Sequence, residues 1–407
     1  MAAPIVGSVP NREGLFGLVA VVVLLAGCDF GSGESPSPTF EPGDNPAFRT
    51  TVLSGAGAGA SEEASQAAVS LTPVVQVRSP TLNATRAQAG HVSYDAERDR
   101  LHVAYKLAGQ PFGGSIDVID VRRDAATANR LLNGQRSVRS PNVDIVEVRW
   151  EADEGALYAA GAVATEKRRR SPAVVSKIVP GGDAVQAQSR RLSDNVAKSV
   201  LPGAAPNAVY VPTDENDLHR FDLDLENQTR RSAGNAAGFR SAIAREERVF
   251  VLDASGRLFA TDANAFDALT EVVRLTDGGF GNGTVARLHA DDDRLYAALN
   301  EEGFALVAPA GDAVWVSEPV SFQSRYTAVT TGAEYLYAGR FDGVVEVYRR
   351  PDTIPDRDLE QIGTFGPWGE AENTLSGAPI NHLLVIDDYL YAANSRDGLV
   401  VARIDRE

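Results

Sequence analysis

A short motif of apolar, aromatic and small residues recurs seven times, and this repetition constrains the fold more than any other feature. The copies are RLHVAY (100–105), ALYAAG (156–161), AVYVPT (208–213), RVFVLD (248–253), RLYAAL (294–299), YLYAGR (335–340) and YLYAAN (389–394). Their marker residues are His102, Tyr158, Tyr210, Phe250, Tyr296, Tyr337 and Tyr391. The markers are 56, 52, 40, 46, 41 and 54 residues apart. A recurrence at this period predicts an array of similar structural units rather than unrelated domains.

Each motif is flanked by further segments that have the composition of strands. A run such as VSYD, EVRW or LLVID precedes it, and an alternating segment such as SIDVID, GRLFAT or GVVEVY follows it. Several repeats add an outer segment, such as EVVRL at 271–275. Four short antiparallel strands per 40–50 residues are typical of a β-propeller blade. We therefore predict an all-β fold, a seven-bladed β-propeller over residues 72–407, with six or eight blades as the alternatives.

The two ends of the repeat region complement each other. The last repeat stops at Glu407 directly after its third strand, so its blade lacks a fourth strand. The segment PVVQVR at 73–78, just before the first repeat, has the pattern of that missing strand. Pairing the two would remove two free sheet edges, which otherwise promote association with other chains. We predict that this N-terminal strand closes the ring.

The first 71 residues predict export and attachment to a membrane. Arg12 precedes an apolar run from Leu15 to Ala26, the order found in secretory signals, and the run is too short to span a bilayer. It ends in Leu-Ala-Gly-Cys at 25–28, which resembles the lipobox of bacterial lipoproteins. That resemblance implies a signal peptide over 1–27, a diacylglyceryl group on Cys28, and a protein facing the periplasm or the exterior. Residues 28–71 are rich in Gly, Ser, Pro, Ala and acidic residues, which predicts a flexible linker.

Charge and cysteine content exclude several kinds of partner. Lys and Arg number 39 and Asp and Glu 55, so the net charge is −16. Nucleic acid is not expected as a partner, because its binding depends on neutralising phosphates with Lys and Arg. Cys28 is the single cysteine, so neither an intramolecular disulfide nor a cysteine zinc site can form.

The repeats also resemble a known group of proteins. The segments APINHLLVIDDYLYAANSRDGLVVARID (378–405) and RDRLHVAY with GGSIDVIDV (98–121) are similar to the LVIVD and YVTN repeats of bacterial surface and envelope propellers. The resemblance implies an extracytoplasmic propeller.

Two groups of residues are candidates for a site in the centre of the ring. His91, His289 and His382 fall in the predicted first strands, which line the channel of a propeller, and imidazoles there could hold a divalent metal. They lie 11, 7 and 9 residues before motif markers 102, 296 and 391, so we expect them at different depths. Near the entry of three first strands lie Arg240, Arg287 and Arg325. If these converge, with His382 near them, they would bind an anion, because guanidinium groups match carboxylate and phosphate.

The function predicted from these features is binding. No GxSxG, HExxH or phosphate-binding glycine loop is present. We therefore expect a non-catalytic scaffold, anchored through Cys28, that binds another envelope protein or a glycan and needs no cofactor. Two alternatives stay open: a hydrolase or lactonase-like enzyme with a channel site and a divalent metal, and a sensor or carrier of a small anionic ligand.

Overall fold

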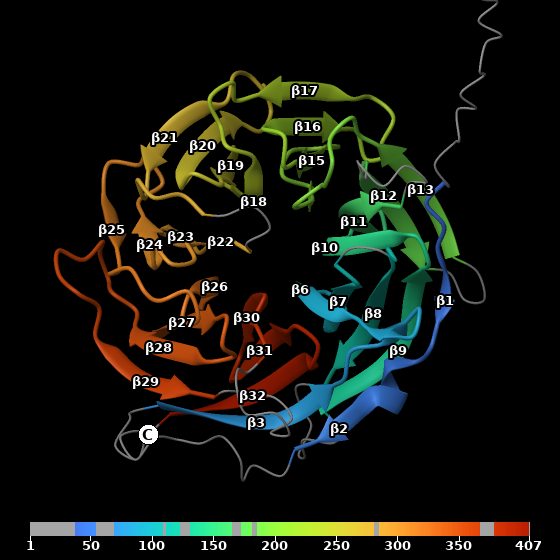
Figure 1. The fold of residues 1–407 in the computed structure, drawn as a ribbon, viewed down its shortest axis with the longest axis horizontal. Helices are drawn as coiled ribbons and strands as arrows, with labels where there is room; N and C mark the ends of the chain where they lie inside the picture. Colours follow the sequence, from blue (N-terminus) through green and yellow to red (C-terminus); the bar gives the residue numbers. More distant parts are fainter. Residues whose placement is uncertain are drawn as a thin grey trace, which may run out of the picture. The chain divides into compact units, whose positions relative to one another are not determined.

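The chain forms a ring of seven small antiparallel sheets. The computed structural model describes residues 37–53, 69–108, 111–122, 131–164, 172–180, 185–280, 285–366 and 378–406. In Figure 1 the sheets follow one another around the ring, with the first strand of each blade nearest the centre. This is the predicted seven-bladed β-propeller. No helix in the described part of the chain has the length and apolar character needed to cross a membrane.

Blades 1 to 4 follow in chain order, each built from four successive strands. Blade 1 contains β6 (Gln88–Asp95), β7 (Arg100–Lys106), β8 (Gly114–Val121) and β9 (Leu132–Ser140). Blade 2 contains β10 (Val143–Glu151), β11 (Ala156–Val163), β12 (Ala173–Pro180) and β13 (Val185–Arg191). Blade 3 contains β14 (Leu201–Pro202), β15 (Val209–Pro212), β16 (Asp217–Phe221) and β17 (Thr229–Ser232). Blade 4 contains β18 (Phe239–Arg245), β19 (Arg248–Asp253), β20 (Arg257–Asp262) and β21 (Thr270–Arg274).

Blades 5 and 6 repeat this arrangement, and blade 7 combines both ends of the propeller. Blade 5 contains β22 (Leu288–Ala290), β23 (Leu295–Ala298), β24 (Phe304–Val307) and β25 (Val314–Val316). Blade 6 contains β26 (Tyr326–Thr331), β27 (Tyr335–Arg340), β28 (Val345–Arg349) and β29 (Gln361–Phe365). Blade 7 contains β30 (His382–Ile386), β31 (Tyr389–Asn394), β32 (Gly398–Arg406) and the N-terminal β3 (Val69–Val77). A short hairpin pairs β4 (Thr81–Leu82) with β5 (Thr85–Arg86).

The recurrent motif forms the second strand of every blade, and its marker residue packs between blades. All seven markers are at most 1% exposed. Two tyrosines also donate hydrogen bonds to the next blade: Tyr158 to the carbonyl of Leu223 at 2.6 Å, and Tyr210 to that of Ala263. The buried apolar side chains form seven clusters, one for each pair of neighbouring blades. The motif is therefore the packing element that holds consecutive blades together.

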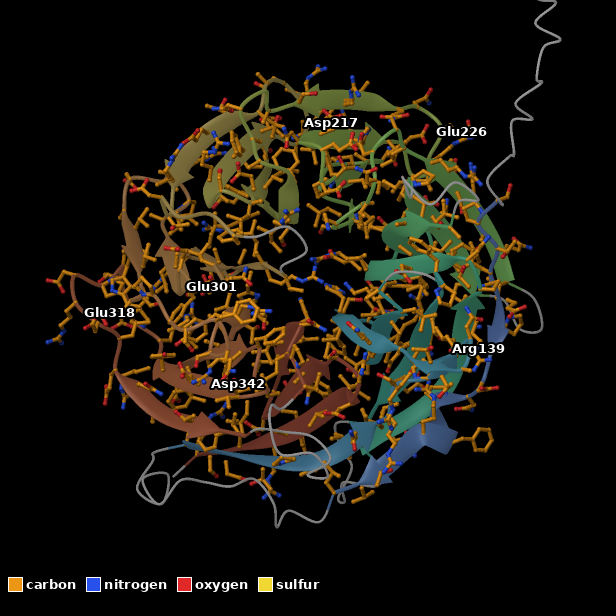
Figure 2. The ribbon with its side chains drawn as sticks, viewed as in Figure 1. Arg139, Asp217, Glu226, Glu301, Glu318 and Asp342 are labelled. Carbon is orange, nitrogen blue, oxygen red and sulfur yellow. The ribbon has the colours of Figure 1, made fainter. Side chains whose placement is uncertain are left out.

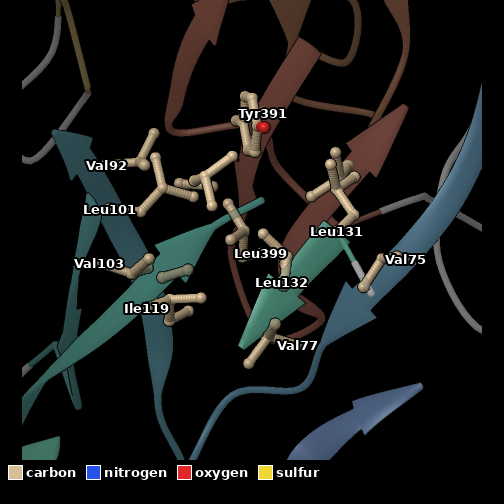
Figure 3. Close-up of a cluster of buried hydrophobic side chains, with 14 of the residues drawn as sticks. Val75, Val77, Val92, Leu101, Val103, Ile119, Leu131, Leu132, Tyr391 and Leu399 are labelled. Carbon is tan, nitrogen blue, oxygen red and sulfur yellow. The ribbon is translucent and has the colours of Figure 1, made fainter. Parts of the chain in front are cut away.

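The ring is closed as the sequence predicts. Strand β3 pairs antiparallel with β32 over its whole length, from Val69 opposite Arg406 to Val77 opposite Leu399. Figure 3 shows the apolar cluster that joins this blade to blade 1, with Val77 and Leu399 of blade 7 near Leu132 of blade 1. The closing blade thus has both a complete backbone ladder and a packed core.

Residues 37–53, here called the N-terminal strap, differ from the prediction. The strap contains β1 (Glu41–Gly43), the 3₁₀ helix η1 (Pro46–Arg49) and β2 (Thr50–Val52). Strand β1 adds to the outer edge of β9 in blade 1, and β2 adds to the outer edge of β3 in blade 7 (Figure 1). Gly134 permits this contact, since a Cβ there would lie 2.3 Å from the backbone nitrogen of Ala47.

The strap also supplies a charge to the interior of blade 1. The Nη2 atom of Arg49 donates to both carboxylate oxygens of Asp117, at 2.6 and 2.7 Å, and Asp117 is fully buried. The prediction of a flexible linker over 28–71 is therefore wrong for residues 37–53. The cause is that strand addition uses backbone hydrogen bonds, so the segment needs no apolar periodicity to become ordered.

Candidate functional site

The inner strands carry the chemistry in the centre of the ring. The face at which these strands begin is called the entry face here. In blades 1, 2, 4 and 6 the ladder between the first two strands has a bulge next to this face. The bulged residue is Gly90, Val146, Arg240 or Thr327, respectively. Because a bulge re-aims the side chains around it, the inner strands can direct polar groups toward the axis. Figure 2 shows side chains from the surrounding blades extending into the middle of the ring.

A buried carboxylate joins four blades at this level. Glu147 of β10 is 1% exposed and accepts three side-chain hydrogen bonds. The donors are Arg287 Nη1 at 2.6 Å, Ser199 Oγ at 2.7 Å and Arg149 Nε at 2.9 Å. Arg287, from blade 5, also donates through Nη2 to the carbonyl of Gly90 in blade 1 at 3.0 Å. Arg287 therefore reaches across the centre of the ring to blades 1 and 2.

The electrostatics of this network favour the ionised form of Glu147. Burial alone would raise the pKa of Glu147, but attraction to Arg149 and Arg287 and the hydrogen bonds from Ser199 and Arg149 outweigh it, so its pKa lies below the usual value. One carboxylate thus faces two guanidinium groups. The side chain of Arg149 is 28% exposed, so part of the excess positive charge is open to solvent.

Two histidines lie side by side next to this network. The rings of His91 and His382 are 4.2 Å apart between centroids. Both have a pKa well below the usual value: burial is the main cause, followed for His91 by Arg149 and Arg287 and for His382 by His91 and Arg287. Neither nitrogen of His91 forms a hydrogen bond with the described residues, and its Nε2 lies 3.9 Å from Glu147 Oε2. Both imidazoles are therefore neutral at neutral pH.

The depth prediction was wrong for this pair of histidines. His91 pairs with Ala104 and His382 with Ala393, and each partner lies two residues after its motif marker. The two histidines therefore share one level. The number of residues between each histidine and its marker differs because the turn after β6 has four residues and the turn after β30 has two. His289 pairs directly with its marker, two residues farther from the entry face, and its Nε2 lies 2.9 Å from the hydroxyl of Thr331.

The histidine triad does not form one group of metal ligands. Of the residues that the structure describes, the three-residue group with suitable ligand atoms within 4.8 Å is Asp194, Asp217 and His219 in blade 3. Its polar atoms already bond to one another or to neighbours: His219 Nε2 to Asp194 at 2.9 Å, and His219 Nδ1 to the amide of Gln228 at 2.7 Å. Asp217, labelled in Figure 2, accepts from Ser232. Near His91 and His382, two arginines would repel a divalent cation, so the centre does not suit one.

Four cations gather at the entry-face end of the centre. Lys106 ends β7, Lys198 precedes β14, Arg240 lies at the bulge of β18, and Arg287 precedes β22. We call these four residues the cationic cluster. Lys198 interacts electrostatically with the other three, and Lys106 also interacts with Arg287. Two of the three arginines named from the sequence, Arg240 and Arg287, thus each interact electrostatically with Lys198.

Among the described residues, neither lysine ammonium group of the cluster has a hydrogen-bond acceptor or an ion-pair partner, although both side chains are partly exposed. The nearest carboxylates are already engaged by backbone amides. Asp144 accepts from the N–H of Leu107 and of Gly113, both at 3.1 Å, and Asp214 accepts from that of Val196 at 3.0 Å. The cluster therefore presents donors that a ligand could use.

Arg325 lies just before β26 in blade 6, two residues ahead of the bulged Thr327, and has other contacts. Its guanidinium carbon lies 3.7 Å from the ring centroid of Phe322 and 3.5 Å from that of Phe341, and its Nη1 donates to the carbonyl of Phe322. The charge that influences it is Glu301. The place of Arg325 in the anion site stays a prediction, since its contacts with described residues are with two aromatic rings and none joins it to the cationic cluster.

Sequence reasoning missed Glu147, Arg149, Lys106 and Lys198. One signal was available: the chain contains only four lysines, and two of them lie in the cationic cluster. Cys28, the predicted lipidation site, and the signal peptide lie outside the described residues.

No family model and no curated protein matches the chain. A solved structure that aligns with the chain is that of the computationally designed Ika8 protein. The two chains are 13% identical, with a TM-score of 0.48, over 81% of this chain and 99% of the other.

Proposed function

We propose that this propeller binds a small anionic ligand, bearing a carboxylate or phosphate group, at the cationic cluster, and that it acts as a sensor or carrier. The observation that carries the proposal is that two lysine ammonium groups, with no acceptor among the described residues, belong to a group that also contains Arg240 and Arg287, in a protein whose net charge is −16. An acidic surface does not by itself attract anions. A local excess of positive charge at the centre of such a protein therefore favours a specific anionic ligand.

The chemistry of the cluster suits carboxylate and phosphate groups. Arginine offers a planar fork of N–H donors, and lysine offers a compact ammonium with three donors. Arg287 is already held by Glu147, so its orientation does not depend on the ligand. Such preorganisation lowers the entropic cost of binding.

A scaffold for large partners receives less support from the described surface. The large apolar side chains exposed there are Phe48, Val52, Val179 and Phe322. They lie on the strap, on a strand of blade 2 and in the loop before β26. A protein-docking face normally has an apolar centre larger than scattered side chains provide.

Attachment to a membrane is part of the same proposal and is supported by the sequence alone. The Leu-Ala-Gly-Cys segment at 25–28 and the residues before it predict a lipid-anchored protein facing the periplasm or the exterior. Mass spectrometry of the N-terminal peptide from membranes should find a lipid-modified Cys28. Recovery of a Cys28→Ser variant in the membrane fraction at the wild-type level would contradict this.

Calorimetry tests the ligand proposal. Titration of the purified protein with inorganic phosphate at low salt should show saturable binding at one site. The Lys106→Gln/Lys198→Gln variant should bind at least tenfold more weakly, since each charge-assisted hydrogen bond contributes about 1.5–3 kcal/mol. Lys177→Gln is the matched control, because Lys177 pairs with Glu154 and Asp224 on the outer part of blade 2. Equal affinities in all three proteins would contradict the proposal.

A further inference from the structure

The apolar exposure of the described surface is concentrated on the N-terminal strap. Among the described residues, the large apolar side chains that are exposed are Phe48, Val52, Val179 and Phe322. Two of these four, Phe48 at 88% and Val52 at 48%, lie within five successive positions of the strap. The side chain of Phe48 contributes little to the fold, since the hydrophobic effect depends on the apolar area removed from water. Phe48 is therefore a candidate for contact with something outside the propeller.

The strap fixes Phe48 to the outer edge of blade 1. Strand β1 pairs with β9 near the end of that strand, with Glu41 opposite Arg139, whereas Ala47 approaches Gly134 near its beginning. Strand β2 then continues onto the outer edge of blade 7 (Figure 1). Phe48 therefore lies on the rim of the ring, at the end of β9 that is farther from the entry face.

The propeller meets the N-terminal part of the chain at the other end of the same edge. Asn142 Nδ2 donates to the carbonyl of Ser37 at 2.8 Å, and Phe40 packs against the apolar cluster between blades 1 and 2. Ser37 follows Cys28 by nine positions, and nine residues span at most about 30 Å. A folded body of about 370 residues has a radius of gyration of about 21 Å and is roughly 50 Å across. A lipid group on Cys28 would therefore bring this rim, and not the far side of the ring, to the membrane.

The charge of the strap does not oppose contact with lipid. Its ionisable side chains are Glu41, Asp44 and Arg49, so the strap contributes only one of the 16 net negative charges. Asp44 pairs with Arg139 at 2.6 Å, and Arg49 pairs with Asp117 at 2.6 Å. An exposed aromatic ring beside paired charges suits the boundary between lipid headgroups and acyl chains.

We propose that the strap is the surface by which this protein contacts a phospholipid bilayer, and that the ring of Phe48 enters the boundary between headgroups and acyl chains. The inference rests on the proposed lipid anchor at Cys28. Because Ser37 and Phe48 lie at opposite ends of one outer edge, contact at both ends places the rim of the ring against the bilayer. The entry face then stands at a steep angle to the membrane, so the bilayer does not cover the cationic cluster.

Fluorescence quenching by labelled lipid tests this inference. Cys28 is the single cysteine, and its sulfur carries the lipid in the anchored protein, so a Phe48→Cys variant has one thiol that accepts a fluorophore. The labelled full-length protein is reconstituted into phosphatidylcholine vesicles that contain doxyl-labelled phosphatidylcholine. The label at position 48 should lose most of its fluorescence, because the doxyl group quenches only at short range.

A position across the ring provides the matched control. Thr270 is an exposed residue of β21 in blade 4, which lies on the side of the ring opposite β2 (Figure 1). A fluorophore on the Thr270→Cys variant should keep its fluorescence in the same vesicles. Melting temperatures equal to that of the wild type show that both variants fold.

The outcomes separate the membrane contact from the anchor. Equal fluorescence losses at positions 48 and 270, or no loss at either in protein that floats with the vesicles, overturn the contact while the anchor stands. A label at position 48 that is shielded from aqueous iodide but is not quenched by doxyl lipid shows that protein covers this place, and this also overturns the contact. Wild-type protein that accepts the fluorophore at Cys28 and does not float with vesicles overturns the anchor and the contact together. Quenching confined to position 48 supports both.

Discussion

Two buried carboxylates differ in the balance of charge around them. One lies at the seam, the place where the strap crosses blades 7 and 1, and the other lies at the centre of the ring. Asp117 of blade 1 has one strong partner, Arg49 from the strap. Burial raises its pKa more than Arg49 lowers it, so the net pKa lies above the usual value. Glu147 has two arginines and a serine, and its pKa lies below the usual value. At the seam the charges balance one to one, whereas at the centre positive charge exceeds negative charge.

This difference is consistent with a structural role for the first region and with the binding role that we propose for the second. A matched pair that holds the strap across blades 7 and 1 leaves no donor for a ligand. The centre contains two lysines that have no acceptor among the described residues. An excess of neighbouring cations costs stability, and the anion that we propose would offset that cost.

The largest expected effect comes from removing the central carboxylate. Glu147→Gln leaves Arg149 and Arg287 close together without a counter-charge, and we expect the free energy of unfolding to fall by about 4–5 kcal/mol. Equilibrium unfolding in urea measures this. A loss below about 1 kcal/mol would show that the network does not join the blades as described.

At the seam, Arg49→Met should destabilise the protein by about 3 kcal/mol at pH 8, because Asp117 is left buried without its partner. The pKa of Asp117 is already raised in the folded state, so the carboxyl can take up a proton as the pH falls. The loss should therefore shrink toward pH 5. Urea midpoints at several pH values provide the measurement, and a loss that does not vary with pH would contradict the assignment of the effect to Asp117.

Two arginines near the entry face, Arg240 in blade 4 and Arg325 before β26 in blade 6, separate binding from packing. Arg240→Gln should weaken phosphate binding about tenfold, the effect of losing one charge-assisted contact. Arg325→Gln should leave the affinity unchanged, since the guanidinium of Arg325 stacks between Phe322 and Phe341. Calorimetry with phosphate compares the two. Equal losses would place Arg325 in the site and contradict its assignment to packing.

The smallest effect concerns pH. His382 has a folded-state pKa well below 6.5, so the unfolded chain binds a proton that the folded protein does not. This group stabilises the protein above about pH 6.5, and its contribution is lost as the pH falls below that value. His382→Gln should reduce the slope of unfolding free energy against pH by up to about 1.4 kcal/mol per pH unit between pH 6 and 5. Identical slopes in variant and wild type would contradict a neutral, buried His382.

The sequence predicted the architecture because the fold depends on short-range patterns. Every motif marker became a buried residue of a second strand, and the segment at 73–78 closed the ring. The strap was not predicted because edge strands pair through their backbone, and backbone pairing does not require a particular amino-acid composition. The site was predicted only in part, since contacts such as that between Arg287 and Glu147 join residues 140 positions apart. The pairing of His91 with His382 depended on turn lengths that residue counts did not resolve.

Diffraction from crystals soaked in sodium selenate, collected at the selenium absorption edge, tests the central claim most directly. Selenate is a tetrahedral dianion that resembles phosphate and gives an anomalous signal. We predict an anomalous peak within hydrogen-bonding distance of Lys198 and Arg240 at the entry-face end of the ring, and its loss in the Lys106→Gln/Lys198→Gln variant. Peaks confined to the outer surface, with none among the four cations, would contradict the account.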